Sequence, residues 1–283
     1  MTEPTLLRRR ARFTGLPLLW LALLGGDARA EEDIPVSADV GVDWASRFVF
    51  RGVVYEDQGL IAQPWADLRL RLQKGDGALR STAFNLGFWG SVHSEATDAV
   101  QPPERIYEVD VAPSLCLEWG AGLSSELRYT IFSSPSRAFS TAHELGLYTR
   151  SSLAWLDARL SLKSELLIAA PTYTPFARLT YAGLQTKPGY TLARGEHGSL
   201  TAYAPLRLGL NLQGEDEVGR TDPLGYRFFQ TGLGLSFDLA KGRRATSTWV
   251  QADLFHTADA FVQGLSRPDP QEEVISAGLG IWL

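Results

Sequence analysis

Between Ala62 and Gln73 the sequence reads AQPWADLRLRLQ, with apolar residues at every second position. A period of two is typical of a β-strand whose two faces meet different surroundings. Five further runs show the same alternation, at residues 81–93, 107–119, 156–168, 200–213 and 275–283. No position on the apolar side of these six runs is charged, although 21% of the chain is charged. Arg or Lys facing lipid at mid-bilayer costs about 2–4 kcal/mol, so the uncharged face predicts contact with hydrocarbon.

A soluble barrel or sandwich also alternates, with its apolar face turned to a core, so alternation alone leaves both folds open. The runs are about ten residues or longer, which suits a tilted membrane strand and exceeds the usual length of soluble strands. The last run continues to the final residue, Leu283.

The connections between the runs alternate between long and short. Long outer loops and short inner turns are typical of outer-membrane barrels. Long connections are expected near 52–59, 95–104, 133–141, 214–224 and 259–271, and short ones near 74–80, 119–123, 152–154 and 240–245. Two connections depart from this pattern, a short outer loop at 170–174 and a long inner turn at 185–198.

These features predict an all-β fold, a transmembrane antiparallel up-and-down β-barrel of about 12 strands, within a range of roughly ten to fourteen. An even number places both termini on the periplasmic side. Tryptophans and tyrosines near the strand ends, Tyr55 and Tyr107 among them, are expected in interfacial girdles. The expected strands are 36–51, 60–73, 81–94, 105–118, 124–132, 142–151, 155–169, 175–184, 199–213, 225–239, 246–258 and 272–283.

The first thirty residues are predicted to be a cleaved signal peptide. Arg8, Arg9, Arg10 and Arg12 precede a short apolar stretch, and Ala28-Arg29-Ala30 offers a cleavage site. The apolar stretch is shorter than the about 20 residues that a membrane helix needs, which disfavours an uncleaved anchor. Residues 31–283 are then a single barrel domain in the bacterial outer membrane, because no linker divides them.

Charge and cysteine content exclude several classes of protein. The leader carries five arginines against Glu3 and Asp27, so the whole-chain charge of −5 becomes about −8 for residues 31–283. An acidic domain argues against nucleic acid as a partner. The single cysteine, Cys116, excludes an internal disulfide framework. The expected partners are outer-membrane lipid, lipopolysaccharide and, during folding, the barrel-assembly machinery; the oligomeric state is left open.

The segment Ser46-Arg47-Phe48-Val49-Phe50-Arg51-Gly52 follows Val36-Ser37-Ala38-Asp39-Val40-Gly41, and Trp89-Gly90 comes later. Together these residues resemble a widespread, largely uncharacterised family of bacterial outer-membrane proteins, whose first strand reads like VSxxVGxxSxYVFRG. The chain departs from that pattern at Phe48, where Tyr is usual. It departs again at its Leu283 end, where Phe or Trp is common. The resemblance implies a membrane location and a barrel fold, but no substrate and no catalytic residues.

The polar faces of the strands are expected to line a water-filled lumen, where opposed charges would set a transverse field. Function is therefore predicted as a porin-like channel for small hydrophilic solutes or ions. The alternative is a closed interior of paired charges, in a structural or surface-binding barrel, because 12 strands lie between filled and open barrels. The residues predicted to line the pore are Arg47, Arg51, Asp67, Arg69, Arg71, Glu108, Asp110, Arg128, Asp157, Arg159, Lys163 and Arg207.

An outer-membrane hydrolase is the rival class. It needs a nucleophile and a base within hydrogen-bond reach, oriented by a third group. The four histidines, His93, His143, His197 and His256, show no distinctive spacing to such partners. The acidic loop 215–217 lacks the ligand spacing of a calcium loop. No catalytic residue, cofactor or metal site is predicted, and the chain is expected not to be an enzyme.

Overall fold

The computed structural model describes residues 36–95, 105–155, 159–173, 180–215, 221–222, 225–241, 244–257 and 271–282. The predicted signal peptide, residues 1–30, and the predicted lumen residue Asp157 lie outside the described residues. None of the described residues forms a helix long and apolar enough to cross a membrane.

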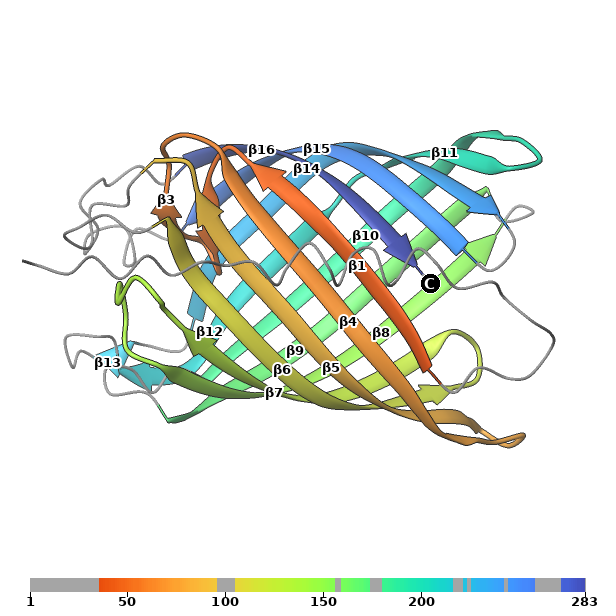
Figure 1. Ribbon diagram of the computed structural model, residues 1–283, viewed down its shortest axis with the longest axis horizontal. Coiled ribbons are helices and arrows are strands. Elements are labelled where there is room, and N and C mark those ends of the chain that lie inside the picture. Colours follow the sequence, from red (N-terminus) through yellow and green to blue (C-terminus); the bar gives the residue numbers. More distant parts are fainter. Residues whose placement is uncertain are drawn as a thin grey trace, which may run out of the picture. The chain divides into compact units, whose positions relative to one another are not determined.

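The described residues form sixteen strands (Figure 1). Eleven long strands and a pair of shorter ones build the barrel wall, and a separate hairpin connects β1 to β4. The strands are β1 Val36–Ala45, β2 Phe48–Phe50, β3 Val53–Glu56, β4 Ile61–Lys74, β5 Leu79–His93, β6 Ile106–Trp119, β7 Leu123–Ser133, β8 Ala142–Trp155, β9 Leu160–Tyr173, β10 Thr180–Arg194, β11 Gly198–Tyr203, β12 Leu206–Glu215, β13 Thr221–Asp222, β14 Gly225–Lys241, β15 Arg244–Thr257 and β16 Gln271–Trp282.

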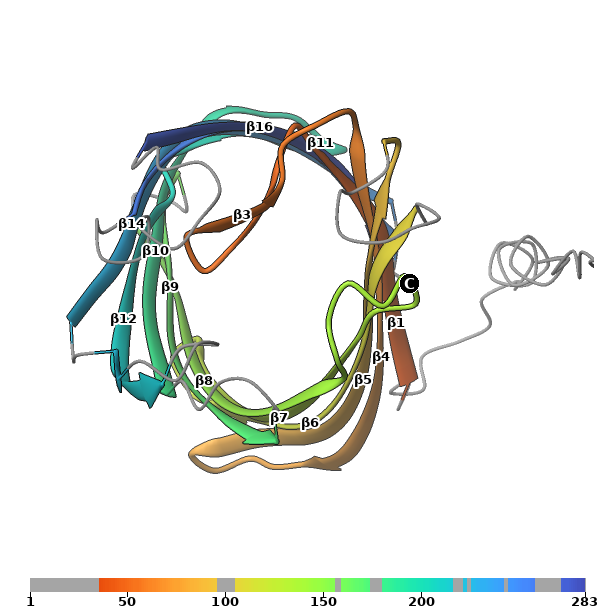
Figure 2. The same ribbon diagram turned by 90° about the vertical axis from the view of Figure 1, so that its left-hand side faces the viewer.

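The sheet closes on itself, as the ring of strands in Figure 2 shows. Each wall strand pairs antiparallel with its neighbours in sequence, and β1 pairs with both β4 and β16. Strands β11 and β12 both lie between β10 and β14 and form one wall position interrupted at Ala204-Pro205. The wall therefore has the 12 positions that the sequence predicts, and the predicted up-and-down barrel is confirmed.

The ladder that closes the barrel is short. It pairs Asp39–Ala45 of β1 with Ser276–Trp282 of β16, and one further pair of hydrogen bonds joins Ser46 to Ile275. By contrast, β14 and β15 pair continuously from Phe228–Lys241 to Arg244–Thr257. We call the β1–β16 ladder the closing seam.

The barrel has its apolar face outside. Leu68, Leu147 and Leu184 are 46%, 47% and 52% exposed, and polar side chains such as Glu126 and Asn211 are buried inside. A soluble barrel would bury the leucines instead. The outward row of leucines is the surface that hydrocarbon covers in a membrane barrel, as the alternation predicts.

Several predicted boundaries are wrong. The short inner turn expected at 152–154 lies within β8, which continues to Trp155. The first strand ends at Ala45 rather than at residue 51, because the chain then turns into the separate β2–β3 hairpin. The long inner turn expected at 185–198 is largely strand, since β10 continues to Arg194. The short outer loop expected at 170–174 begins later, because β9 continues to Tyr173.

A bulge near the long-loop end reverses the direction of side chains in β6. Ser91 faces Glu108, but Val92 faces Ile106, so Tyr107 is an extra residue in β6. Tyr107 and Glu108 are consequently both buried, whereas Ile106 is exposed. Tyr107 was predicted on the apolar outer face and in a girdle; it lies inside instead, because the bulge breaks the period of two.

Candidate functional site

The β2–β3 hairpin folds into the barrel, where Figure 2 shows β3 inside the ring of wall strands. Its two-residue turn consists of Arg51 and Gly52, with φ values of 52° and 82°. Positive φ at both central residues is the geometry of a type I′ turn, which suits the twist of a hairpin. Glycine adopts this conformation freely, but arginine does not, so strain on the order of 1 kcal/mol is held at Arg51.

Arg51 joins the tip of the hairpin to the opposite wall. Its guanidinium donates two hydrogen bonds, of 2.7 and 2.8 Å, to the carboxylate of Glu144 on β8. It also lies 4.4 Å from the ring centroid of Tyr181 on β10. The Arg51 carbonyl accepts a hydrogen bond of 2.9 Å from Nε of Arg227 on β14. Burial disfavours the charged form, but the Glu144 carboxylate outweighs it and the pKa of Arg51 is raised.

Gly52 approaches the wall too closely for a side chain. A Cβ placed there would lie 2.6 Å from Cβ of Phe228. Phe228 is 1% exposed and packs with Tyr181, Phe255 and Val274. The tip is thus held by an ion pair, a cation–π contact and close packing together.

The base of the hairpin packs on a second cluster. Phe48 is buried with Ile61 and Tyr107. At the end of β3, the Glu56 carboxylate accepts the backbone N–H groups of Asp57 and Gln58, both at 2.9 Å. These contacts fix the hairpin at the end opposite to its tip. Tyr55, predicted in a girdle, lies on this hairpin and contacts the Phe48 and Tyr107 rings.

Three side chains are arranged in the order acid, histidine and hydroxyl, as in a hydrolytic triad: Glu56, His93 and Ser91. His93 Nδ1 lies 3.6 Å from Glu56 Oε2, and His93 Nε2 lies 2.8 Å from Ser91 Oγ. However, Ser91 and His93 are 0% and 1% exposed, and the Tyr107 ring stacks on the imidazole. A nucleophile needs access to its substrate, so in this arrangement the row anchors β3 to β5.

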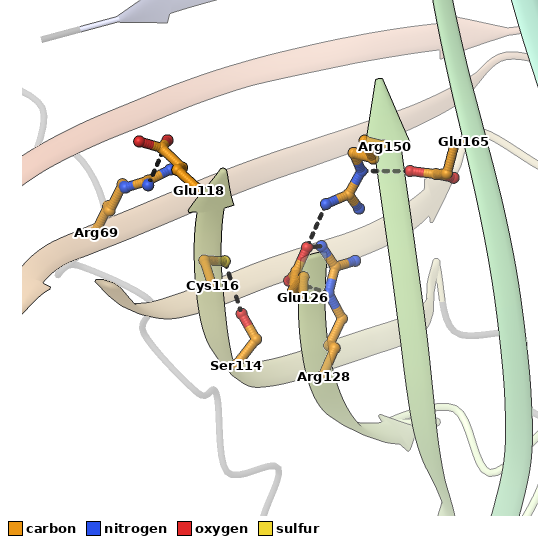
Figure 3. Close-up of polar contacts among 8 residues, drawn as sticks. All are labelled: Arg69, Ser114, Cys116, Glu118, Glu126, Arg128, Arg150 and Glu165. Carbon is orange, nitrogen blue, oxygen red and sulfur yellow. Dashed lines mark hydrogen bonds and ion pairs between the residues drawn. The ribbon is translucent and has the colours of Figure 1, made fainter. Parts of the chain in front are cut away.

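The inner wall carries a row of charges of both signs (Figure 3). Glu126 accepts hydrogen bonds of 2.8 and 3.1 Å from Arg128. It also forms an ion pair of 2.5 Å with Arg150. Arg150 also pairs with Glu165 on β9. Both arginines lie over the Tyr148 ring, at 4.6 and 4.9 Å from its centroid. These contacts order the charged groups across β7, β8 and β9.

A second ion pair lies on the neighbouring strands. Arg69 of β4 donates a hydrogen bond of 2.7 Å to Glu118 of β6, and Ser81 of β5 donates one of 2.6 Å to the same carboxylate. Both charged side chains are well exposed to the lumen, at 33% and 45%. The pair therefore contributes little stability and presents its charges to water.

Two cavities lined by described residues lie inside the barrel. One has a volume of about 460 Å³ and lies between the hairpin residues 49–51 and the wall. The other, of about 330 Å³, lies toward the short-turn end among residues of β7 to β10. Glu165 and Gln185 belong to the lining of both, so the cavities adjoin.

The predicted lumen residues fall into several places. Arg51, Asp67, Asp110, Arg128 and Arg207 line the larger cavity, and Lys163 lines the smaller one. Of the rest, Arg69 pairs with Glu118, Glu108 is buried beside Tyr107, Arg71 is half-buried on β4, Arg47 is half-buried between β1 and β2, and Arg159 is exposed before β9.

Three important residues were not predicted: Glu144, Arg150 and Arg227. The period of two within β8 places Glu144 and Arg150 on the inner face, so that signal was available. Arg227 carries no such signal. It turns inward because a bulge shifts the register near Tyr226, and Tyr226 itself stays exposed.

No protein-family model and no curated protein matches the chain. Among solved structures it is similar to an outer membrane channel from Pseudomonas putida F1, with 13% identity, a TM-score of 0.52, and coverage of 91% of this chain and 98% of that one. It is also similar to the β domain of the Bordetella autotransporter BrkA, at 11% identity, TM-score 0.46, and coverage of 87% and 97%. LpxR from Salmonella typhimurium matches at 8% identity, TM-score 0.46, and coverage of 86% and 99%.

A closed antiparallel barrel with an apolar exterior and a charged interior defines the class of this protein. It is a β-barrel of the bacterial outer membrane, surrounded by lipid.

Proposed function

We propose that this protein is an outer-membrane channel through which small hydrophilic solutes or ions diffuse. The observation that carries the proposal is the hollow, charged lumen: two adjoining cavities of about 460 and 330 Å³ lined by ionised side chains. An apolar interior filled by side chains would leave these charges without solvation, whereas water and ions in a hollow lumen solvate them.

The hairpin narrows this channel, because it lies inside the ring of wall strands. It reaches from the β1–β4 side to Glu144 on β8, and so divides the lumen near the long-loop end. Solutes pass beside the hairpin, between residues such as Asp67 and Arg128 that face the larger cavity. Carboxylates and guanidiniums in that space act on passing ions from both sides and favour small polar solutes.

The second candidate is a barrel that does not conduct and serves a structural or surface-binding role. The observation in its favour is the set of contacts that hold Arg51 to Glu144, Tyr181 and Arg227. If the hairpin fills the lumen completely, the charges below it pair across a closed interior.

Planar bilayer recording separates the two candidates. Refolded protein, purified as the heat-modifiable folded species, is expected to give discrete conductance steps in potassium chloride. Folded protein that inserts into the bilayer and stays silent at all voltages would favour the non-conducting barrel and contradict the channel.

The charge row predicts the ion selectivity of the channel. Glu126→Gln removes the carboxylate that Arg128 and Arg150 share; Arg150 keeps its ion pair with Glu165, whereas Arg128 loses its own. We expect the reversal potential in a salt gradient to shift toward anion preference, with some loss of stability because a buried pair is broken. Glu196→Gln, at a carboxylate 88% exposed in the turn after β10, is the matched control. Equal shifts in both variants would contradict a role for the row.

We propose further that lipopolysaccharide surrounds the outer rim and that the barrel-assembly machinery inserts the chain. The apolar register of β16, with Ile275 63% exposed, is what such a terminal strand presents to lipid. Depletion of the machinery is expected to leave the chain unfolded in the periplasm, and normal insertion would contradict this partner.

A further inference from the structure

The smaller cavity has a more basic lining than the larger one. Its ionised lining consists of Arg150, Lys163 and Lys187 against one carboxylate, Glu165. The Arg150 guanidinium is already engaged by Glu126 and Glu165. The two lysines therefore supply positive charge that the cavity itself does not neutralise.

Lys163 and Lys187 are directly opposite each other on neighbouring strands. They form a cross-strand pair between β9 and β10, and both line the cavity. Like charges placed directly opposite destabilise a sheet. Within the described part of the chain, neither lysine makes an ion pair with a carboxylate. Asp238 and Asp253 attract Lys187 only from a greater distance, outside this lining.

Lys187 is held in place by an aromatic ring. Its Nζ lies 3.5 Å from the ring centroid of Tyr203 on β11. A cation–π contact orients an ammonium group without removing its charge. Hydroxyl and amide groups complete the lining, from Ser124, Ser152 and Gln185.

We propose that this cavity binds a compact oxyanion, a phosphate group above all, between Lys163 and Lys187. Ammonium groups bind phosphate as point charges, and serine hydroxyls donate to its remaining oxygens. The ligand neutralises the opposed lysines, and the mixed lining accommodates either free phosphate or a small phosphorylated solute. The site's part in transport rests on the proposed channel, in which it would be a transient binding site for anions near the short-turn end.

Equilibrium binding tests the site without any need for conductance. Isothermal titration calorimetry on the folded full-length barrel in detergent uses inorganic phosphate in one arm and glycerol 3-phosphate in the other. We expect saturable binding in at least one arm, weakened about tenfold or more in the Lys163→Gln/Lys187→Gln variant. The arm that binds more tightly identifies the source of the phosphate group. The variant should fold, because it removes a repulsion.

Lys74→Gln is the matched control, since Lys74 is an exposed lysine at the same end that lines neither cavity. Absence of saturable binding in both arms would overturn the proposal, and so would equal affinity in the double variant and the wild type.

Bilayer recording then separates this proposal from the channel. Phosphate is expected to reduce the chloride current of the wild type but not of the double variant. A channel that conducts and ignores phosphate contradicts the site alone. A silent barrel that binds phosphate through the two lysines contradicts the channel alone.

Discussion

Replacing Arg51 with alanine is expected to release the hairpin and to give larger, noisier conductance steps than the wild type. The substitution removes both hydrogen bonds to Glu144 and the contact with the Tyr181 ring. It also leaves the Glu144 carboxylate buried without its cation. Breaking one partner of a buried pair costs about 3 kcal/mol or more, which shifts the docked fraction of the hairpin by about a hundredfold.

Single-channel recording with matched variants checks this expectation. Glu144→Gln should produce the same phenotype from the other side of the ion pair. Arg137→Ala removes an exposed arginine that lines neither cavity and should leave the conductance unchanged. An Arg51→Ala channel with wild-type step size would show that the hairpin does not set the width of the path.

Leu68→Arg is expected to destabilise the folded barrel in lipid vesicles by about 2–4 kcal/mol, because the charge would face hydrocarbon near the middle of β4. Leu68 is 46% exposed on the outer face. Urea unfolding in vesicles, followed by tryptophan fluorescence, measures the change. Lys or Arg on the inner face of β4 would meet water instead.

Gln63→Arg provides that comparison on the same strand. Gln63 lies directly opposite Asp43 of β1, so the new guanidinium gains a carboxylate neighbour. Its effect on the free energy of unfolding should be within about 1 kcal/mol. If the two arginines cost the same, lipid does not cover the leucine row, and the membrane assignment of the outer face is wrong.

The wall of the barrel was predictable because successive side chains of each strand face lipid and water in turn. This environment alternates with a period of two, so the pattern of apolar and polar residues places Leu68 outside and Arg69 inside. The same logic would have identified Arg150. Alternation fails where the backbone inserts an extra residue, as at Tyr107, because a bulge changes the face of the residues before it in the strand.

The hairpin and the pairing of charges were not predictable in this way. Residues 48–56 continue an apolar and aromatic pattern that reads as an extension of the first strand, and nothing periodic indicates that it leaves the wall. Arg51 and Glu144 are 93 positions apart, and their meeting depends on how the barrel closes. The segment that carries the family resemblance supplies this tip, Arg51-Gly52, while membership in that family stays a prediction.

The closing seam has a consequence for biogenesis. Its partners lie at the two extremes of the domain, and Ser46 and Ile275 are 229 positions apart. No hydrogen bond of this ladder can form before the final strand has been synthesised and exported. Because pairing of β1 with β16 needs both ends of the domain, we expect this seam to be the last ladder to form during insertion.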